Sequence, residues 1–292
     1  MRRARAALLL VACHAAPAAS LLAPSASQAV IVATGDGTDT ASAPSPDPGF
    51  SRLAIVAGLS GVYLGEGWLL TAGHVLTAAR NQKKLDVTLD GAHYRLLPET
   101  AVPLSRGAEK ADLVLVRIAD GPALPVLRIA AKTPPQGAKL FLAGNGPRRN
   151  AAASCWNAAG QPAAKPGPGV RCGFEWVKKE KEEDPPMNAA RWGSNVVAEG
   201  AALFPGPQGT RTPVFGTRFR PPGAGASSHE AQAGVGDSGG PVFVKEGDRW
   251  LLAGVMLGVS AQLPRAAVFG DRTWVADLSA YRESIEAALA PR

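Results

Sequence analysis

The 292-residue sequence has little cysteine and histidine, with only three cysteines and four histidines. Its N-terminal apolar run, Ala6 to Ala12, is too short to span a bilayer, and no stripe of Lys and Arg with interleaved aromatic residues is present. These gaps predict no metal, no organic cofactor and no nucleic-acid partner, despite a formal net charge of +7. Three of the positive charges, Arg2, Arg3 and Arg5, lie in a segment that we expect to be removed.

That N-terminal segment is typical of an export signal. Basic residues precede the short apolar run, and small residues follow it. We predict a signal peptide over residues 1–29, cut after Ala29, and a secreted or periplasmic protein. The alternative is lipidation at Cys13, because residues 10–13 (LVAC) resemble a bacterial lipoprotein box. Only that second route predicts attachment to a membrane.

The remaining chain has the composition of a folded, loop-rich protein, with 46% apolar residues, 33 glycines and 25 prolines. Residues 30–50 are expected to be a flexible N-terminal segment, since most of them are small, polar or proline. From residue 51 onward, short apolar runs are separated by turn residues, as at Asp90-Gly91, which is typical of a hairpin. Residues 124–129 are expected to be one of the strands, and a short helical turn is expected after His74. One longer helix is predicted, over residues 278–289. This pattern favours an all-β barrel or sandwich.

Two features stand out between residues 145 and 190, where the strand pattern is interrupted. Cys155 and Cys172 form a pair in a chain that we expect to be exported, which predicts a disulfide. No histidine or second cysteine cluster is near enough in the sequence to suggest a zinc site instead. The charged run at residues 178–184 (KKEKEED) predicts a solvated loop.

The strongest chemical signal is the hexapeptide GDSGGP at residues 236–241. Glycines on both sides of Ser238 allow a sharp turn that exposes the hydroxyl, with backbone N–H groups beside it. The pattern G-x-S-x-G also occurs in α/β-hydrolases, but their histidine follows the serine, and no histidine lies beyond Ser238. A subtilisin-type order requires an aspartate before the histidine, where only the flexible segment offers candidates. The order histidine, aspartate, serine remains.

His74 and Asp112 are the candidates for the other two positions. His74 follows an apolar run that predicts a strand, and a strand end holds a general base firmly at the edge of a cleft. Asp112 begins another apolar run, where its carboxylate can accept the imidazole Nδ1–H. Two other histidines, His93 and His229, are expected to have structural roles.

Three motifs together, TAGHV (71–75), ADLVLVRI (111–118) and GDSGGP (236–241), resemble those of the chymotrypsin–trypsin-like serine peptidases. The resemblance covers roughly residues 50–289 and implies two antiparallel six-stranded β-barrels with a C-terminal α-helix. Residues 51–135 would form the first barrel, carrying His74 and Asp112, and residues 136–292 the second, carrying Ser238. The resemblance also implies that the N–H groups of Gly236 and Ser238 form the oxyanion hole.

Departures from the family pattern concern specificity and activation. Gln232 stands where the family has the floor of its primary specificity pocket, and a trypsin-like preference would require an aspartate there. The family's usual disulfides are missing. In many relatives a new N-terminus pairs with the aspartate before the serine, here Asp237. Because Ile31-Val32 lies beside the predicted cut after Ala29, we hypothesise that export itself creates the activating terminus.

The predicted function is hydrolysis of peptide bonds in a protein or peptide substrate by a monomeric serine endopeptidase. Ser238 would attack, His74 would transfer the proton and Asp112 would orient His74. Two rivals remain open: a catalytically silent binding module on the same fold, and an esterase that uses the same three residues.

Overall fold

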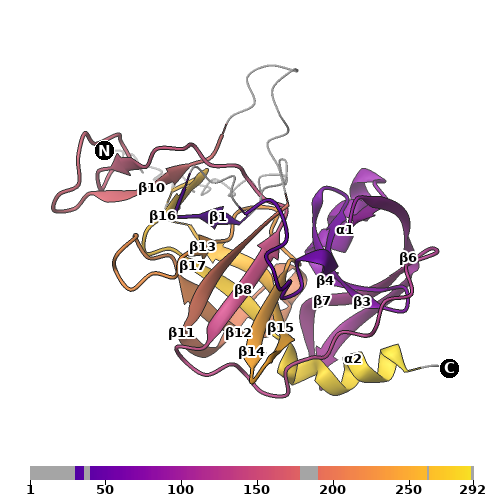
Figure 1. The fold of residues 1–292 in the computed structure, drawn as a ribbon. Helices are drawn as coiled ribbons and strands as arrows, with labels where there is room; N and C mark the ends of the chain where they lie inside the picture. The colour runs from indigo at the N-terminus through magenta and orange to yellow at the C-terminus, as the bar shows by residue number, and fades with distance from the viewer. Residues whose placement is uncertain (1–29, 36–39, 178–189, 262, 291–292) are drawn as a thin grey trace, which may run out of the picture.

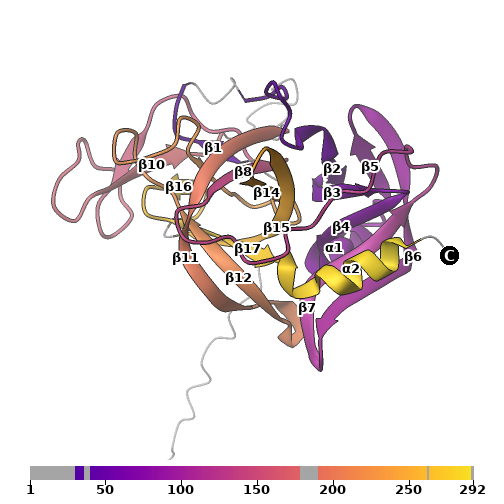
Figure 2. The same ribbon diagram turned by 60° about the horizontal axis from the view of Figure 1, so that its bottom comes forward.

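The structure is a computed structural model that describes residues 30–35, 40–177, 190–261 and 263–290. Two closed β-barrels lie side by side, and the C-terminal helix runs from the second barrel to the first (Figures 1 and 2). Two six-stranded antiparallel barrels with a short C-terminal helix confirm the predicted fold class.

The first barrel has the strand order β2-β3-β4-β7-β6-β5. Its strands are β2 (Leu53–Val56), β3 (Leu59–Gly65), β4 (Trp68–Ala72), β5 (Asp86–Leu89), β6 (Ala92–Arg106) and β7 (Glu109–Ile118). Helix α1 (Gly73–Gln82) connects β4 to β5, and the 3-10 helix η1 (Phe50–Arg52) precedes β2. The predicted hairpin is confirmed: Asp90 and Gly91 have φ angles of 48° and 77°, the left-handed pair that a two-residue turn of this kind requires.

The second barrel has the strand order β11-β12-β17-β15-β14-β8. Its strands are β8 (Lys139–Gly144), β11 (Arg191–Pro205), β12 (Arg211–Arg218), β14 (Pro241–Glu246), β15 (Arg249–Ser260) and β17 (Arg272–Asp277). The 3-10 helix η2 (Pro207–Gly209) lies in the β11–β12 connection. After β17 come the 3-10 helix η3 (Leu278–Tyr281) and helix α2 (Arg282–Leu289), which together cover the predicted helical range.

One apolar cluster crosses from barrel to barrel and fixes how they meet. It joins residues of the first barrel, such as Leu113, to Leu257 and Phe243 of the second and to Ile285 of α2. All four side chains are buried, with exposed fractions of 4% or less. Because burial of apolar surface is the main force in folding, this shared core holds the facing edges of the barrels together.

Two small sheets lie outside the barrels. β9 (Ser154–Trp156), β10 (Arg171–Glu175) and β16 (Ala266–Val268) form a three-stranded sheet with β10 in the middle. The predicted disulfide is present in it, joining Cys155 to Cys172 as a directly paired cross-strand couple. The other sheet pairs β1 (Ile31–Val32) with β13 (Ala231–Gln232).

The structure differs from the sequence predictions in three places. Residues 30–33 begin the segment that we expected to be flexible, yet they are buried, because β1 pairs with β13 and its apolar side chains enter the core. Residues 124–129, which read as a strand, form only an isolated bridge at Ile129. Helix α1 is ten residues long, although the sequence indicated only a short turn after β4.

Some predictions fall outside the described residues. These are the signal peptide with its cut after Ala29, the alternative lipidation of Cys13 and the charged run at residues 178–184. Within the described residues, no helix has both the length and the apolar character needed to cross a membrane.

Candidate active site

His74 and Asp112 are in direct contact at the edge of the first barrel. His74 is the second residue of α1, and Asp112 lies in β7. The residue after Asp112, Leu113, pairs with Ala72, the last residue of β4. The His74 Nδ1 atom is 2.6 Å from Asp112 Oδ2, and the His74 backbone N–H donates to Asp112 Oδ1 at 2.9 Å. One carboxylate therefore orients the imidazole and also satisfies a free N–H at the start of the helix. The His74 side chain is 30% exposed and that of Asp112 only 5%.

Two glycines leave room for the Asp112 carboxylate. A Cβ atom on Gly73 would lie 2.9 Å from Asp112 Oδ1, and one on Gly206 would lie 3.2 Å from Asp112 Cβ. Gly206 belongs to the β11–β12 connection of the second barrel, so Asp112 is packed from both sides of the barrel interface. From β12, the strand that follows this connection, the Thr212 hydroxyl accepts the Asp112 backbone N–H at 2.9 Å. The second barrel thus helps to position a residue of the first.

Ser238 lies in a tight turn between β13 and β14. Gly236 and Gly239 have φ angles of 109° and 84°, a backbone conformation that favours glycine. Two hydrogen bonds fix the turn: Gly239 N donates to Met256 O at 2.7 Å, and Gly240 N donates to Asp237 O at 2.8 Å. The residues on either side of Ser238 are buried, whereas Ser238 itself is partly exposed. The turn presents the serine as its flanking glycines predicted.

This serine turn packs against the end of β4, two residues before His74. A Cβ atom on Gly239 would lie 2.4 Å from Ser60 O and 3.1 Å from Ala72 N. The Ser60 hydroxyl donates to Gly236 O at 2.9 Å, so the turn is also tied to β3. The structure therefore brings the serine turn to the same edge of the first barrel as the His74–Asp112 pair. Within the described residues, no hydrogen bond joins the Ser238 hydroxyl to His74.

Asp237, next to the serine, is fully buried. Its Oδ2 atom accepts the Gly234 N–H at 2.7 Å, whereas its Oδ1 atom is buried and has no hydrogen-bond partner among the described residues. A Cβ atom on Gly144 would lie 2.0 Å from that Oδ1, so only glycine fits beside it. Burial raises the pKa of the Asp237 carboxyl well above its ordinary value, and the Gly234 hydrogen bond only partly opposes this.

Strand β13 ends five residues before Asp237 in the sequence, and β1 pairs with it. Ile31 is paired with Gln232, and the preceding residue, Val30, is fully buried in a cluster that includes Ala233. Because the strands are antiparallel, Val30 lies toward the end of β13 that continues to Gly234. Gly234 is the residue whose N–H contacts the Asp237 carboxylate.

Gln232 is buried, with 1% of its surface exposed. Its side-chain amide donates from Nε2 to Arg272 O at 3.1 Å. The Oε1 atom is buried without a hydrogen-bond partner in the described part of the chain. Gln232 therefore offers a hydrogen-bond acceptor close in sequence to Ser238, but no charge.

The other two histidines of the described residues, His93 and His229, have different partners. His93 lies in the β5–β6 hairpin, where its Nδ1 is 3.2 Å from the Thr88 hydroxyl. The His229 ring packs on Trp192 with their centroids 4.6 Å apart. Within the described residues, no group of three or more Cys, His, Asp or Glu side chains could hold a metal ion.

Comparison with known proteins agrees with this architecture. Residues 59–251 match the trypsin-like peptidase domain, so the chain belongs to the trypsin-like peptidase family, a family of proteases. No curated protein matches the sequence.

Among solved structures, neuropsin, a serine protease of mouse brain, is 15% identical to this chain, with a TM-score of 0.47. The match covers 86% of this chain and 98% of the neuropsin chain. The MamO protease domain from Magnetospirillum magneticum is 16% identical, with a TM-score of 0.41, and the match covers 84% of this chain and 98% of the MamO chain. An inactive mutant form of Rv3671c from M. tuberculosis H37Rv is 14% identical, with a TM-score of 0.42, and the match covers 90% of this chain and 99% of the Rv3671c chain.

Proposed function

We propose that the protein is a serine endopeptidase that works through an acyl-enzyme. The Ser238 hydroxyl attacks the substrate carbonyl and transfers its proton to His74, which later donates a proton to the leaving amine. The acyl-enzyme is then hydrolysed by water, activated by the same imidazole. Asp112 holds the imidazole in the tautomer whose Nε2 can accept a proton, and stabilises the cation that forms.

The observation that carries this proposal is the double contact between Asp112 and His74. The 2.6 Å contact at Nδ1 leaves Nε2 for the serine, and the second oxygen, bound to the His74 N–H, prevents the carboxylate from rotating. The serine turn packed against Ala72 supports Ser238 as the nucleophile. Neither Gly236 N nor Ser238 N donates to another described residue, which supports their assignment to the oxyanion hole.

The decisive test is covalent labelling with a fluorophosphonate probe, followed by peptide mapping. The chain offers a matched control, because Ser228 lies beside a histidine, with its hydroxyl 3.2 Å from His229 Nδ1. We expect Ser238→Ala to abolish labelling and to lower turnover by about 10⁶. Ser228→Ala should leave both unchanged. Equal labelling of wild type and Ser238→Ala would reject Ser238 as the nucleophile, and a wild-type protein that is not labelled at Ser238 would favour a silent binding module.

The same protein then separates a peptidase from an esterase. A peptidase cleaves internal peptide bonds in a peptide library, and every cleavage disappears in Ser238→Ala. Turnover of activated esters without any peptide cleavage would favour the esterase. The Gln232 side chain, buried and uncharged, supports a preference for P1 residues other than Arg and Lys.

We also propose that cleavage before Val30 activates the enzyme. Val30 is buried where β1 joins β13, and the Asp237 Oδ1 atom has no partner among the described residues. A new α-ammonium group at Val30 could pair with that carboxylate, which would support the adjacent oxyanion turn.

The activation proposal is tested with two proteins, one beginning at Val30 and one carrying Gly-Ser in front of it. Turnover should be about a hundredfold lower for the extended protein, since an oxyanion donor contributes on that order. Equal turnover of the two proteins, or an active natural form that begins at Cys13, would contradict the proposal. Labelling of Ser238 in both proteins would still support the nucleophile.

A further inference from the structure

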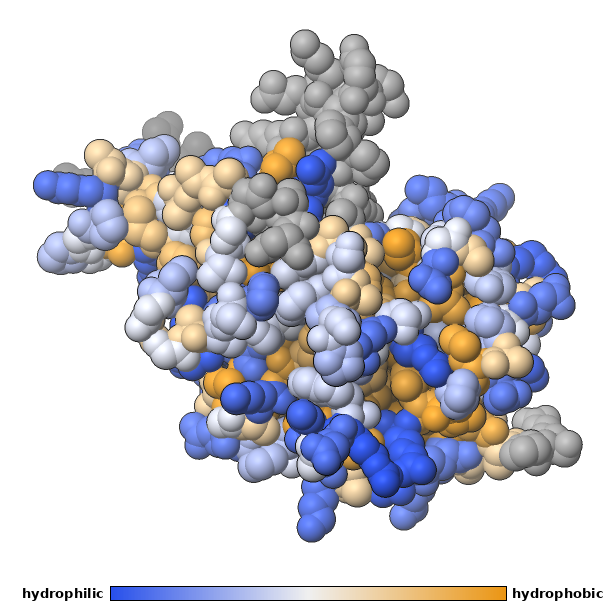
Figure 3. Space-filling model, viewed as in Figure 1, coloured by the Kyte–Doolittle hydropathy of each residue, from blue (hydrophilic) through white to orange (hydrophobic). Residues whose placement is uncertain are grey.

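A groove of about 700 Å³ lies on the outer face of the second barrel and shares no residue with the candidate active site. Its floor carries the aromatic residues Phe141, Trp192 and Trp250. One wall is formed by three prolines of the N-terminal segment, and the other by residues 225–229. On the face shown in Figure 3, apolar side chains gather over β8 and β14, with hydrophilic side chains along the lower border.

The aromatic floor is preformed. The rings of Phe141 and Trp192 are stacked, with centroids 5.5 Å apart, and Trp250 meets Phe141 edge-on at 6.2 Å. Trp192 also holds the proline wall in place, because its backbone N–H donates to Thr40 O at 3.1 Å and its indole Nε1 to Ser42 O at 2.7 Å. A ligand therefore meets aromatic surface that is already ordered, which lowers the entropic cost of binding.

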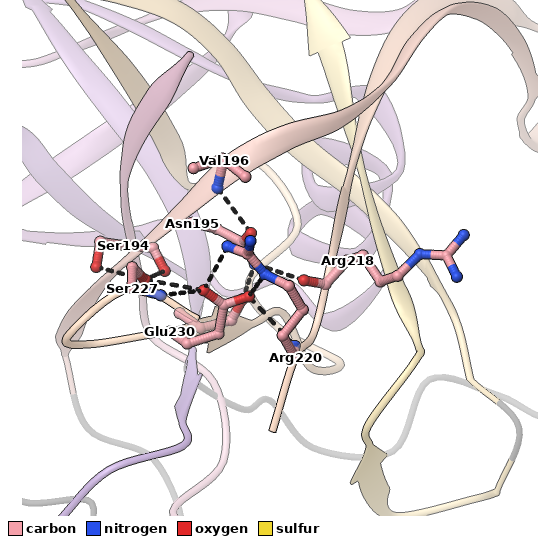
Figure 4. Close-up of polar contacts among 8 residues, drawn as sticks. Ser194, Asn195, Val196, Arg218, Arg220, Ser227 and Glu230 are labelled. Atoms are coloured by element: carbon pink, nitrogen blue, oxygen red, sulfur yellow. Dashed lines mark hydrogen bonds and ion pairs between the residues drawn. The ribbon is translucent and has the colours of Figure 1, made fainter. Parts of the chain in front are cut away.

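The opposite wall is held by a buried carboxylate (Figure 4). Glu230 is fully buried and binds Arg220 through both oxygens, at 2.9 and 3.0 Å. The Glu230 Oε2 atom also accepts the Ser227 N–H at 2.8 Å and the Ser227 hydroxyl at 2.9 Å. Ser227 in turn is bonded to Ser194 of β11 at 2.9 Å. This network ties the loop to the barrel wall and keeps the groove open.

The groove is positively charged. Its lining contains Lys139, Lys245, Arg220 and His229 but no Asp or Glu. Arg220 is neutralised by Glu230, whereas Lys139 and Lys245 are exposed and form no ion pair with any described residue.

The acids nearest in sequence are not part of the lining. The Asp47 carboxylate, in the proline wall, accepts the backbone N–H groups of Gly49, Phe50 and Ser51. Glu246, which follows Lys245 in β14, lines a different cavity. No carboxylate of the groove lining would therefore repel a negatively charged ligand bound at Lys139 and Lys245.

We propose that this groove binds an extended peptide segment that carries acidic and aromatic side chains. The aromatic and proline surfaces match apolar side chains, and the two lysines match carboxylates. A sulfated polysaccharide fits less well, because such polymers need a longer row of unpaired cations. In a peptidase the bound segment would belong to a protein substrate. That physiological reading rests on the proposed function, whereas binding to the groove does not.

The experiment measures binding of a fluorescent peptide in which Glu and Tyr alternate, with a Lys–Tyr peptide and dextran sulfate as comparisons. The protein carries Ser238→Ala throughout, so that the peptide is not cleaved. The groove variant is Lys139→Glu with Lys245→Glu. The matched control, Lys84→Glu with Lys165→Glu, changes the net charge equally at exposed lysines outside the groove lining.

We expect the groove variant to bind the Glu–Tyr peptide roughly tenfold more weakly, because two exposed charge contacts contribute modestly. The control should bind it as the parent does, and the Lys–Tyr peptide should not bind. Equal affinities for groove and control variants, or dextran sulfate binding in the groove without peptide binding, would overturn the proposal.

If the groove variant does not fold, Ala226→Glu, on the opposite wall, provides the same comparison. With Ser238 restored, turnover of a small ester should be equal in the groove variant and wild type. Failure of peptide binding with normal ester turnover would therefore reject the groove and leave the proposed catalytic site standing.

Discussion

Replacing Gly73 with alanine should separate activity from stability. A Cβ atom there would lie 2.9 Å from Asp112 Oδ1, whereas ordinary van der Waals contact begins at 3.4 Å. The carboxylate oxygen is the group that can yield, so it should move by about half an ångström, and this movement disturbs both of its contacts with His74. Since misplacement by about 1 Å can cost 10²-fold in rate, we expect kcat/KM to fall by about ten- to a hundredfold.

Stability should respond differently, because Gly73 is helical and has no positive φ. Alanine favours a helix over glycine by up to about 1 kcal/mol, so the free energy of unfolding should be unchanged or slightly higher. The assay is kcat/KM on a peptide substrate beside urea unfolding. Gly200→Ala is the control, since a Cβ atom there has no neighbour within 4 Å. Wild-type kcat/KM in a folded Gly73→Ala protein would refute the role assigned to the Asp112 carboxylate.

Three further outcomes are expected. Replacing both Cys155 and Cys172 with serine should lower the free energy of unfolding by about 3 kcal/mol, measured with denaturant, because the bridge closes a short loop. Burial raises the pKa of Tyr281 to about 12, so the folded protein should lose stability as the pH rises above 10; Tyr281→Phe should remove that alkaline loss in thermal melts. Asp237→Asn should act in opposite directions in the two N-terminal forms. In the extended protein the substitution should raise the free energy of unfolding at neutral pH, because a buried carboxyl with a raised pKa destabilises the fold once the pH exceeds the pKa of that carboxyl in the unfolded chain. In the protein beginning at Val30 the substitution should lower the free energy of unfolding by about 3 kcal/mol, because a buried ammonium group loses its partner. The same sign in both forms would contradict the pairing.

Much of the candidate site could be predicted from local pattern. The glycines around Ser238 indicated a sharp turn, and the apolar run before His74 indicated a strand end, because both depend on residues a few positions apart. The missed features depend on distant residues. Thr212 and Gly206 reach Asp112 from a hairpin about a hundred residues away, and no signal in the sequence marks either as part of the site.

The N-terminal segment shows the same limit. Residues 30–50 looked flexible because most of them are small, polar or proline, yet Val30 and its neighbours are buried by pairing with β13, some 200 residues later. The sequence showed Asp237 only as part of the GDSGGP motif. That its side chain is buried, and that its Oδ1 atom has no partner among the described residues, depends on the tertiary structure around it.

The sequence by itself determined the all-β class, the Asp90-Gly91 hairpin, the terminal helix and the order of the three motifs, since each follows from neighbouring residues and their periodicity. Only the tertiary structure decided which carboxylate oxygen meets which nitrogen of His74, that the second barrel packs against Asp112, and that a basic aromatic groove lies between the N-terminal segment and residues 225–229. The physical reason is that these contacts join residues far apart in the chain. Their geometry is set by how two separately patterned barrels bury one shared core.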